Sequence, residues 1–326
     1  MITIELVKQI EPQHASYILE QQKNFPYDYI RGIRKDSLIS YLLDDIKKHF
    51  TRKDTICFLS KIKDELVGFL ILQTLTWDSE IFGFPSARIK YLFSIEDKFS
   101  ASIKDALLKE MINWAKEKGI KFIDCHLHPL DLSGISSLTK NGFELIATHI
   151  HHVWDFRKEF SLSFTPKTYI KFANTDDLPL LESISEDIIP YYNRFNLDEK
   201  IRETGKVPLM FKEWLKNSLL GRAKCVLLAI EDNKVVGYTT VVVKEDTRST
   251  LGLTLADVEL TGVVPTTRNK GIYRDMIITA VNWAKENNID IMEGVIHACN
   301  APANVIPPQL NARVLGAHHT FHWHAD

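Results

Sequence analysis

The sequence predicts an α/β (α+β) fold built from two similar domains, each a mixed sheet flanked by helices. The chain has 326 residues, which is long for one compact core and suits two domains. The two halves match each other at one constant shift, and the matching segments are INWAKE at Ile112–Glu117 with VNWAKE at Val281–Glu286, Val67–Phe69 with Val236–Tyr238, and His128 with His297. A shift this long indicates duplicated domains, because solenoid repeats are far shorter.

Residues 1–158 form the first predicted domain, and its clearest element is the helix Asp36–Phe50. Apolar side chains recur there at helical spacing and share one face, namely Leu38, Tyr41, Leu42, Ile46 and Phe50. A second helix, Ser102–Lys118, ends before Gly119, a residue type that often caps helices. The other expected elements are strands at Glu5–Ile10, Cys57–Lys61, Glu65–Leu75 and Phe122–His128, and helices at Pro12–Gln22 and Leu132–Asn141.

Residues 159–168, which contain Pro166, form the expected linker, and residues 169–326 form the second domain. Its patterns repeat the order of the first domain. The expected strands are Tyr169–Ala173, Cys225–Glu231, Lys234–Val243, Val258–Val264, Ile289–His297 and His319–Trp323. The expected helices are Asp177–Asp187, Val207–Leu220, a helix that begins near Ile272, and Asn304–Leu315.

The composition is that of an ordinary globular protein, with 45% hydrophobic and 25% charged residues. The net charge of −2 predicts no basic surface for nucleic acid, and no apolar run reaches membrane-spanning length, so we expect no membrane insertion. The N-terminal segment MITIELVKQI alternates like a strand and does not resemble a signal peptide. The cysteines, Cys57, Cys125, Cys225 and Cys299, form no CxxC pair, which favours buried free thiols and a cytoplasmic protein.

Four histidines gather near the C-terminus, and they are His318, His319, His322 and His324. Strand spacing divides them between the two faces of a strand. No carboxylate or cysteine pattern accompanies them, so we expect no metal site.

The segment VELTGVVPTTRNKGIYRDM, residues 258–276, predicts a strand, a tight loop and the start of a helix. Pro265 ends the strand because proline cannot donate to a sheet. The first N–H groups of a helix have no partner within the helix, and with the helix dipole they favour a bound phosphate. Gly271 allows the backbone to approach a ligand closely, and Arg268 and Lys270 supply positive charge.

The pattern Arg268-x-x-Gly271-x-Tyr273, after a strand that ends in Val-x-Pro, resembles the pyrophosphate loop of the GNAT acyl-CoA N-acyltransferases. Tyr273 departs from the family pattern, which has a small residue there. The resemblance implies tandem GNAT-like domains with mostly antiparallel sheets, acetyl-CoA as cosubstrate and a small-molecule amine as acceptor. It also implies a CoA-binding segment made of Arg268, Asn269, Lys270, Gly271, Ile272 and Tyr273.

In that family the strand before the loop separates from its neighbour, and its backbone holds pantetheine. This implies that Gly262 and Val263 bind the cosubstrate and that one of their N–H groups polarises the thioester carbonyl. Asp257 and Glu259 lie two residues apart, so their side chains share one face of the strand. Either carboxylate suits the general base that a protonated amine requires near pH 7. We favour Glu259, because it is closer to Gly262 and its side chain is longer.

The general acid departs from the family pattern, in which an asparagine is followed seven residues later by a tyrosine. Asn304 matches the asparagine and is expected near CoA, but Asn311 occupies the place of the tyrosine and is a poor proton donor. Three alternatives stay open. Another group such as Tyr273 protonates the thiolate, the thiolate leaves unprotonated because its pKa is about 8.5, or the activity is weak or lost.

Two further segments resemble those of two-domain dTDP-fucosamine acetyltransferases within the superfamily. They are Trp77–Gly83, WDSEIFG, and Arg194–Asp198, RFNLD, which is followed by FKEW at Phe211–Trp214. The resemblance implies that Trp77, Arg194 and Asp198 contact the acceptor. It further implies a nucleotide-linked amino deoxysugar that is acetylated for surface polysaccharide synthesis. Two alternative functions stay open, namely acetylation of another small amine and non-catalytic binding of acyl-CoA. A homodimer also stays open.

The internal repeat predicts different roles for the two halves. At the shift that aligns Ile112 with Val281, the loop positions 268–271 fall on Phe99, Ser100, Ala101 and Ser102, which have neither the charge nor the glycine of the second loop. We therefore expect residues 1–158 to bind no CoA and to shape the acceptor site.

Overall fold

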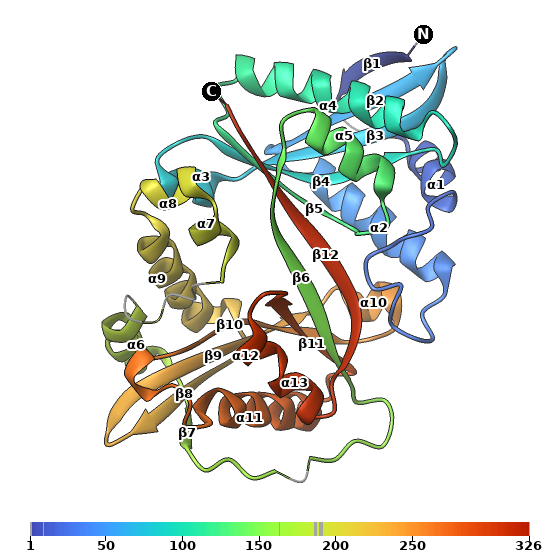
Figure 1. Cartoon of the computed structure of the whole chain (residues 1–326). Helices are drawn as coiled ribbons and strands as arrows, with labels where there is room; N and C mark the ends of the chain where they lie inside the picture. The colour runs from blue at the N-terminus through green and yellow to red at the C-terminus, as the bar shows by residue number, and fades with distance from the viewer. Residues whose placement is uncertain (1, 9, 163, 186–187, 189–191, 326) are drawn as a thin grey trace. The chain divides into compact units, whose positions relative to one another are not determined.

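A computed structural model describes residues 2–8, 10–162, 164–185, 188 and 192–325 (Figure 1). The chain forms two compact units, of which unit 1 contains residues 1–148 with 317–326 and unit 2 contains residues 149–316. Each unit is a mixed, mostly antiparallel sheet flanked by helices, which confirms the predicted fold class.

The sheet of unit 1 has the strand order β1-β2-β3-β4-β5-β12. Its strands are β1 (Ile2–Val7), β2 (Thr55–Ile62), β3 (Glu65–Thr74), β4 (Ser86–Ser94), β5 (Phe122–Leu127) and the last part of β12 (Arg313–His324). Its helices are α1 (Pro12–Glu20), α2 (Lys35–Phe50), α3 (Thr76–Phe82), α4 (Ser100–Glu117) and α5 (Leu132–Lys140). The pair β4–β5 is parallel, and the other registered pairs in this sheet are antiparallel. The apolar face of α4, with Ile103, Leu107 and Met111, packs on this sheet and closes the core.

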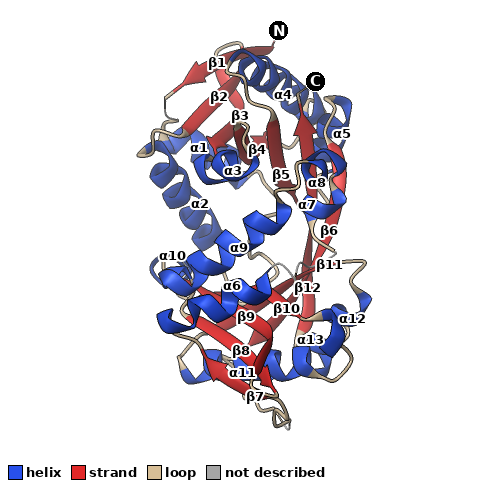
Figure 2. Cartoon of the chain, turned by 90° about the vertical axis from the view of Figure 1, so that its left-hand side faces the viewer, coloured by secondary structure: helices blue, strands red, loops and turns tan. Residues whose placement is uncertain are grey.

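The sheet of unit 2 has the order β6-β11-β10-β9-β8-β7. Its strands are the last part of β6 (Glu144–Asp155), β7 (Tyr169–Phe172), β8 (Cys225–Glu231), β9 (Lys234–Lys244), β10 (Leu255–Val263) and β11 (Ile291–His297). Its helices are α6 (Leu178–Ser185), α7 (Arg194–Leu197), α8 (Glu199–Glu203), α9 (Val207–Asn217), α10 (Thr247–Leu251), α11 (Ile272–Glu286), α12 (Ala301–Asn304) and α13 (Ile306–Gln309). Figure 2 shows α6 and α9 on one face of this sheet and α11 on the other.

The structure repeats itself at the shift found in the sequence. When the shift is added to the first and last residues of β4, it gives the first and last residues of β10. The same holds for β6 and β12. Left-handed backbone also recurs at the same offset, at Gly83 (φ 80°) and Gly252 (φ 72°), and at Gly142 (φ 81°) and Asn311 (φ 65°). The tandem arrangement predicted from the sequence is therefore present in the fold.

Several local predictions differ from the structure. The helix expected over Asn304–Leu315 is wrong, because α12 and α13 are short and β12 begins at Arg313. Pro307 and Pro308 lack the N–H groups that a continuous helix needs, whereas α5, the counterpart in unit 1, has no proline and is unbroken. Strands β4 and β6 were not predicted at all. The helix expected over Asp177–Asp187 is α6, and its last two residues lie outside the described residues.

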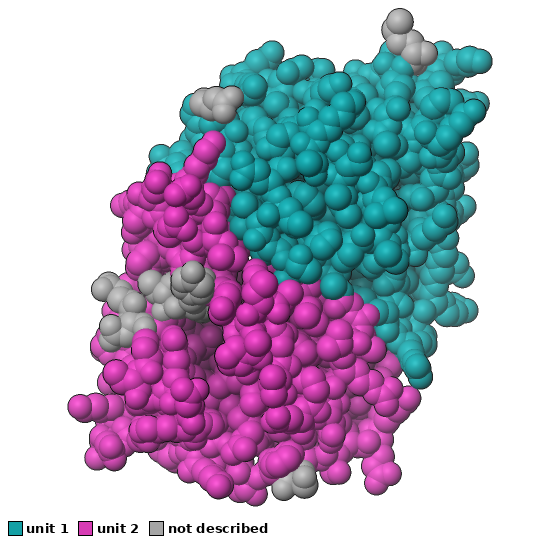
Figure 3. Space-filling model, viewed as in Figure 1, with its two compact units in different colours: residues 1–148, 317–326 teal, residues 149–316 magenta. Residues whose placement is uncertain are grey.

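The compact units differ from the predicted division into 1–158, 159–168 and 169–326 at both boundaries. Figure 3 colours the two units, and each combines segments from both repeats. The last part of β12 pairs with β5 in unit 1, and residues 149–155 of β6 pair with β11 in unit 2. The two repeats have therefore exchanged the ends of their final strands. Periodicity reveals a strand but not the sheet that it joins, so the sequence gives no sign of this exchange.

Candidate active site

The predicted phosphate loop lies between β10 and α11, with a 3-10 turn at Pro265–Thr267. Asn269 (φ 65°) and Gly271 (φ 87°) both adopt left-handed backbone. The first helical hydrogen bond runs from the N–H of Asp275 to the carbonyl of Gly271 at 3.0 Å. The N–H groups that precede Asp275 in this helix therefore have no acceptor within the helix, and such N–H groups at a helix start can bind an anion. This loop is largely exposed, and its geometry suits a pyrophosphate.

The side chains of the loop have internal partners that a ligand would compete with or replace. Arg268 Nε donates to the carbonyl of Val263 at 3.2 Å, and Lys270 Nζ lies 3.0 Å from both carboxylate oxygens of Glu231. Ile272 is buried beneath the loop, and Tyr273 packs against the core between the sheet and α11. Burial raises the pKa of the Tyr273 hydroxyl, so this group keeps its proton at neutral pH.

The strands β10 and β11 pair only over part of their length. Their parallel register joins Leu255–Val258 to Ile291–Gly294, while β10 continues to Val263 and β11 continues to His297. A β-bulge between Val258 and Thr261 turns β10 at this point. Among the described residues, no pairing joins the two strands beyond the bulge, so a gap opens there as the family resemblance implied.

The direction of the backbone groups along this gap follows from strand alternation. The N–H of Val264 donates to the carbonyl of Val236 on β9 at 2.8 Å. Because successive N–H groups of a strand point to opposite sides, the N–H of Gly262 faces β9, while those of Thr261 and Val263 face the gap. A side chain at Gly262 would collide with Ile188, which accounts for the glycine. Val263 is therefore the better placed of the two predicted backbone donors, and Thr261 joins it.

Glu259 is held by two side chains, one from α9 and one from the segment that follows α9. Arg222 donates to both carboxylate oxygens, from Nη1 to Oε2 and from Nη2 to Oε1, the second at 2.6 Å. Trp214 Nε1 donates to Oε2 at 3.3 Å, and the Arg222 guanidinium lies 5.7 Å from the centre of the Trp214 ring. Both oxygens of this predicted base thus already accept hydrogen bonds.

Asp257 lies in a different environment on the same face. Its Oδ2 accepts from Lys244 Nζ at 2.6 Å, while Oδ1 is buried and receives no hydrogen bond from the described residues. Its cross-strand partner is Glu293, whose Oε2 lies 3.9 Å from Lys244 Nζ and whose Oε1 lies 3.6 Å from His151 Nδ1. Burial raises the pKa of Asp257, Lys244 opposes this increase, and Glu293 adds to it.

Histidines occupy the end of β11 and the strand beside it. His297 and His149 are cross-strand partners with ring centres 5.7 Å apart, and Tyr192 stacks on His297 at 5.7 Å. Burial, followed by the nearby His297 and Arg194, lowers the pKa of His149 to about 4. Burial also lowers the pKa of His297. Both rings are therefore neutral at pH 7.

Asn304 and Asn311, at the places of the asparagine and the tyrosine of the family pattern, have structural contacts. Asn304 Nδ2 donates to the carbonyls of His297 and Asn300, both at 2.9 Å, and Asn304 Oδ1 lies 2.8 Å from His152 Nε2. Asn304 thus fixes the turn after β11. Asn311 is exposed, its backbone is left-handed, and its Nδ2 donates to the carbonyl of Ser161 at 3.0 Å.

The residues predicted to contact the acceptor are not brought together by one element. Arg194 begins α7 and stacks over Phe195, with Cζ 4.5 Å from the ring centre. Asp198 is buried and caps α8 by accepting from the N–H of Ile201 at 3.0 Å. Trp77 is a half-buried residue of α3 in unit 1.

Lys244, Glu293 and Arg222 were not among the residues predicted from the sequence. A charged residue inside a buried strand pattern was the available signal for Glu293, which is 2% exposed in β11. Lys244 is the last residue of β9, and Arg222 is the last residue of the segment after α9. A lysine or arginine at such a position predicts only a solvated surface.

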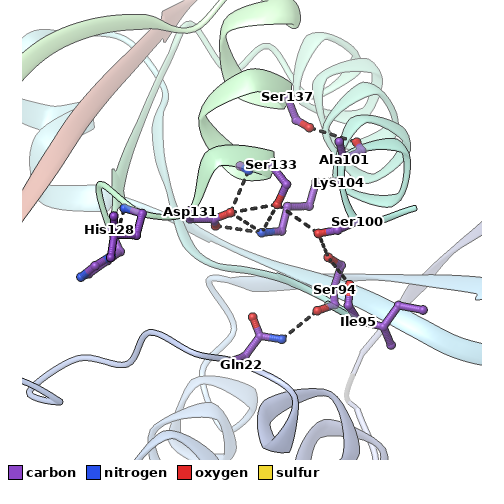
Figure 4. A network of polar contacts seen from close by, with 12 residues as sticks. Gln22, Ser94, Ile95, Ser100, Ala101, Lys104, His128, Asp131, Ser133 and Ser137 are labelled. Atoms are coloured by element: carbon purple, nitrogen blue, oxygen red, sulfur yellow. Dashed lines mark hydrogen bonds and ion pairs between the residues drawn. The ribbon is translucent and has the colours of Figure 1, made fainter. Parts of the chain in front are cut away.

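Unit 1 has a buried polar network at the place that corresponds to the phosphate loop (Figure 4). Helix α4 begins at Ser100, three residues earlier than α11 relative to the repeat, so a helical turn replaces the loop. Lys104, whose side chain is 1% exposed, donates to both oxygens of Asp131 at 2.6 and 2.8 Å and to Ser133 at 3.0 Å. The hydroxyls of Ser94, Ser100 and Ser133 continue the network at 2.8 and 3.0 Å.

The cysteines are free in the structure, and Cys57, Cys125 and Cys225 are buried as predicted. Cys299 is a correction, because it is exposed in the turn that follows β11. Over the described residues, none of the helices combines the length and the apolar character needed to cross a membrane.

Unit 2 thus combines a strand pair that separates after four paired residues with a loop of left-handed residues that leads into a helix N-terminus. Residues 181–304 match the family model of the acetyltransferase (GNAT) family. This segment therefore matches GNAT acetyltransferase domains, and the chain as a whole has a tandem fold similar to that of a solved tandem GNAT protein.

Solved structures agree with this fold. A tandem GNAT protein from the clavulanic acid biosynthesis pathway is 13% identical, with 100% of this chain and 99% of that chain covered and a TM-score of 0.56. A GCN5-related N-acetyltransferase from Sphaerobacter thermophilus is 12% identical, with 99% and 95% covered and a TM-score of 0.62. A GCN5-related glucosamine N-acetyltransferase region of a fungal multi-domain β-N-acetylglucosaminidase is 10% identical, with 99% and 38% covered and a TM-score of 0.67. No curated protein matches the chain.

Proposed function

We propose that unit 2 transfers acetyl from acetyl-CoA to the amino group of a nucleotide-linked amino deoxysugar. The observation that carries the transfer is the gap between β10 and β11 beside the loop at residues 265–271. The loop would hold the pyrophosphate on its N–H groups. The pantetheine arm would extend along β10, with the N–H groups of Thr261 and Val263 toward it.

The acceptor chemistry is supported by the carboxylates at this gap. An amine must lose a proton before it attacks the thioester, and Asp257 and Glu259 are the two acidic groups of β10 on the α9 face. The departing thiolate has a pKa of about 8.5 and leaves without a strong acid. Tyr273 is partly buried against the core, and the proposed reaction assigns it no part in proton transfer.

The sugar class is supported by the character of the face around Glu259 and by one structural relative. Hydroxyl groups of a sugar need hydrogen-bond partners, and a sugar ring packs well on an indole. Trp214, Arg222 and Glu259 provide both kinds of contact within one cluster. The fungal region with a TM-score of 0.67 is a glucosamine N-acetyltransferase, that is, an enzyme for an amino sugar on a related fold.

The test is thiol release from acetyl-CoA with a panel of amines, which contains dTDP- and UDP-linked amino sugars, free glucosamine, amino acids and an aminoglycoside. We expect the highest kcat/KM with a nucleotide-linked amino sugar. A higher value with an amino acid or aminoglycoside would contradict the sugar class while it supports acetyl transfer. Binding of CoA without turnover of any amine would contradict the enzymatic proposal.

A further inference from the structure

The two repeats differ at one cross-strand pair beside the gap. In unit 1 the pair is Arg88 and Asp124, which lie opposite each other on β4 and β5. Arg88 donates to both oxygens of Asp124 at 2.6 and 2.7 Å, so the pair is neutral and fully bonded. At the shift that relates the two repeats, the same pair in unit 2 is Asp257 and Glu293, again opposite each other on β10 and β11.

Unit 2 therefore places two carboxylates where unit 1 has an ion pair. Lys244 Nζ is shared between them, at 2.6 Å from Asp257 and 3.9 Å from Glu293. Two buried acids that share one lysine are less favourable than a paired arginine and aspartate, because buried charge must be compensated. Unit 1 shows that this fold does not require the two acids, and such departures from the favourable arrangement concentrate at functional sites.

The two carboxylate oxygens of Asp257 have different contacts. Lys244 occupies Oδ2, while Oδ1 is buried and receives no hydrogen bond from the described residues. Other charged groups face this aspartate from each strand packed against it, and they are Lys244 on β9, Glu293 on β11 and Glu259 further along β10. His151 on β6 faces Glu293. Glu259 is itself held by Arg222, whereas Glu293 lies between Lys244 and His151 and is the cross-strand partner of Asp257.

We propose that Lys244 and Glu293 are positioning residues for proton transfer in unit 2, and that they act on Asp257 in opposite directions. Lys244 fixes the carboxylate by Oδ2 and leaves Oδ1 to accept the proton of the acceptor amine. Glu293 offsets the charge of Lys244, so that Asp257 remains basic enough to take this proton. The proposal rests on the proposed acetyl transfer, and it adds two residues and a mechanism of control.

The experiment is the pH dependence of kcat/KM for the amine, measured at saturating acetyl-CoA. Removal of the negative charge in Glu293→Gln lowers the pKa of Asp257, so the acidic limb of the profile moves to lower pH, by about one unit. Removal of the positive charge in Lys244→Met raises that pKa, so the limb moves to higher pH, by about 1–3 units. The pKa of the free amine is the same in every experiment, so it cannot cause a difference between the variants.

Matched controls separate control of the proton from general damage. Lys224 and Glu245 form an exposed ion pair at 2.7 Å, and Lys224→Met and Glu245→Gln should leave the limb in place. Glu293→Asp keeps the charge and should restore the wild-type limb even if its rate is lower. Equal losses of activity in Glu293→Gln and Lys244→Met with an unmoved limb would overturn the proposal, and so would shifts in the same direction.

A second measurement applies if no amine in the panel is acetylated. The carboxyl carbon of Asp257 can be titrated by NMR in the full chain, with its assignment from the Asp257→Asn variant. Opposite displacements of its midpoint in Glu293→Gln and Lys244→Met would support the coupling although the proposed function had failed. An unchanged midpoint in both variants would overturn the coupling itself.

Discussion

At the scale of single residues, Asp257 and Glu259 illustrate what spacing alone decides. Their separation by two residues correctly places both on one face of β10. Spacing favoured Glu259, because its longer side chain is nearer to Gly262. The contacts favour Asp257, since Arg222 and Trp214 occupy both oxygens of Glu259, while Oδ1 of Asp257 has no donor in the described part of the chain. Such partners come from β9, β11 and the segment after α9, which no local pattern connects to β10.

The first prediction separates these two carboxylates. Asp257→Asn should lower kcat by about 10²–10⁴-fold, because a positioned base contributes about this much, and should leave the affinity for CoA unchanged. Glu259→Gln weakens the contacts of Arg222 and Trp214, so we expect mainly a higher KM for the acceptor, with kcat reduced less than in Asp257→Asn. Steady-state kinetics with CoA titrations check both variants. The reverse ranking of kcat would assign the base to Glu259.

At the scale of elements, prediction from sequence succeeded where the signal is local. The strand, loop and helix around Gly271 were anticipated because proline, glycine and helical periodicity all lie within one short segment. Strands β4 and β6 were missed, and the exchange of β6 and β12 was not foreseen, because strand pairing is decided by residues far apart in the chain. The same limit applies to the site, in which Glu293 and Lys244 acquire a role only through their neighbours.

The second prediction concerns the phosphate loop. The double variant Arg268→Ala with Gly271→Asp should weaken CoA binding at least tenfold, which is about 1.4 kcal/mol. It removes a cation, places a carboxylate against the pyrophosphate, and requires a left-handed backbone (φ 87°) that aspartate adopts less readily than glycine.

Calorimetric titration with CoA measures this effect, and two variants identify its source. Gly271→Ala imposes the backbone cost without the charge, so a loss as large as that of the double variant would assign the effect to loop geometry. Lys224→Met removes an exposed cation outside the loop and should leave the affinity unchanged. An unaltered affinity in the double variant would contradict the assignment of this loop to CoA.

At the scale of the whole molecule, duplication provides each unit with the same scaffold and different chemistry. Unit 1 keeps the parallel pair β4–β5 and the helix that follows β4, but at the corresponding places Arg88 is bonded to Asp124 and Lys104 to Asp131. Unit 2 keeps a loop with left-handed residues and, within the described residues, a buried carboxylate oxygen without a donor. We therefore propose that unit 1 serves as a scaffold and that unit 2 carries the active site.

The last prediction follows from this difference, and it is that the chain binds one CoA. In unit 1 the helix starts at Ser100, so the N–H groups that would form a phosphate loop belong to a helical turn, and Lys104 is buried in an ion pair with Asp131. A pyrophosphate there would have to break this pair, which would leave the buried charge of Lys104 without its partner, whereas binding at the exposed loop of unit 2 has no such cost. Calorimetry should therefore give a stoichiometry of one, and the double variant at Arg268 and Gly271 should weaken that single site. Asp105→Asn, which alters a surface ion pair of α4, serves as the control and should leave the stoichiometry at one. Two bound CoA molecules, with a second site whose affinity the double variant leaves unaltered, would show that unit 1 opens its network to a ligand.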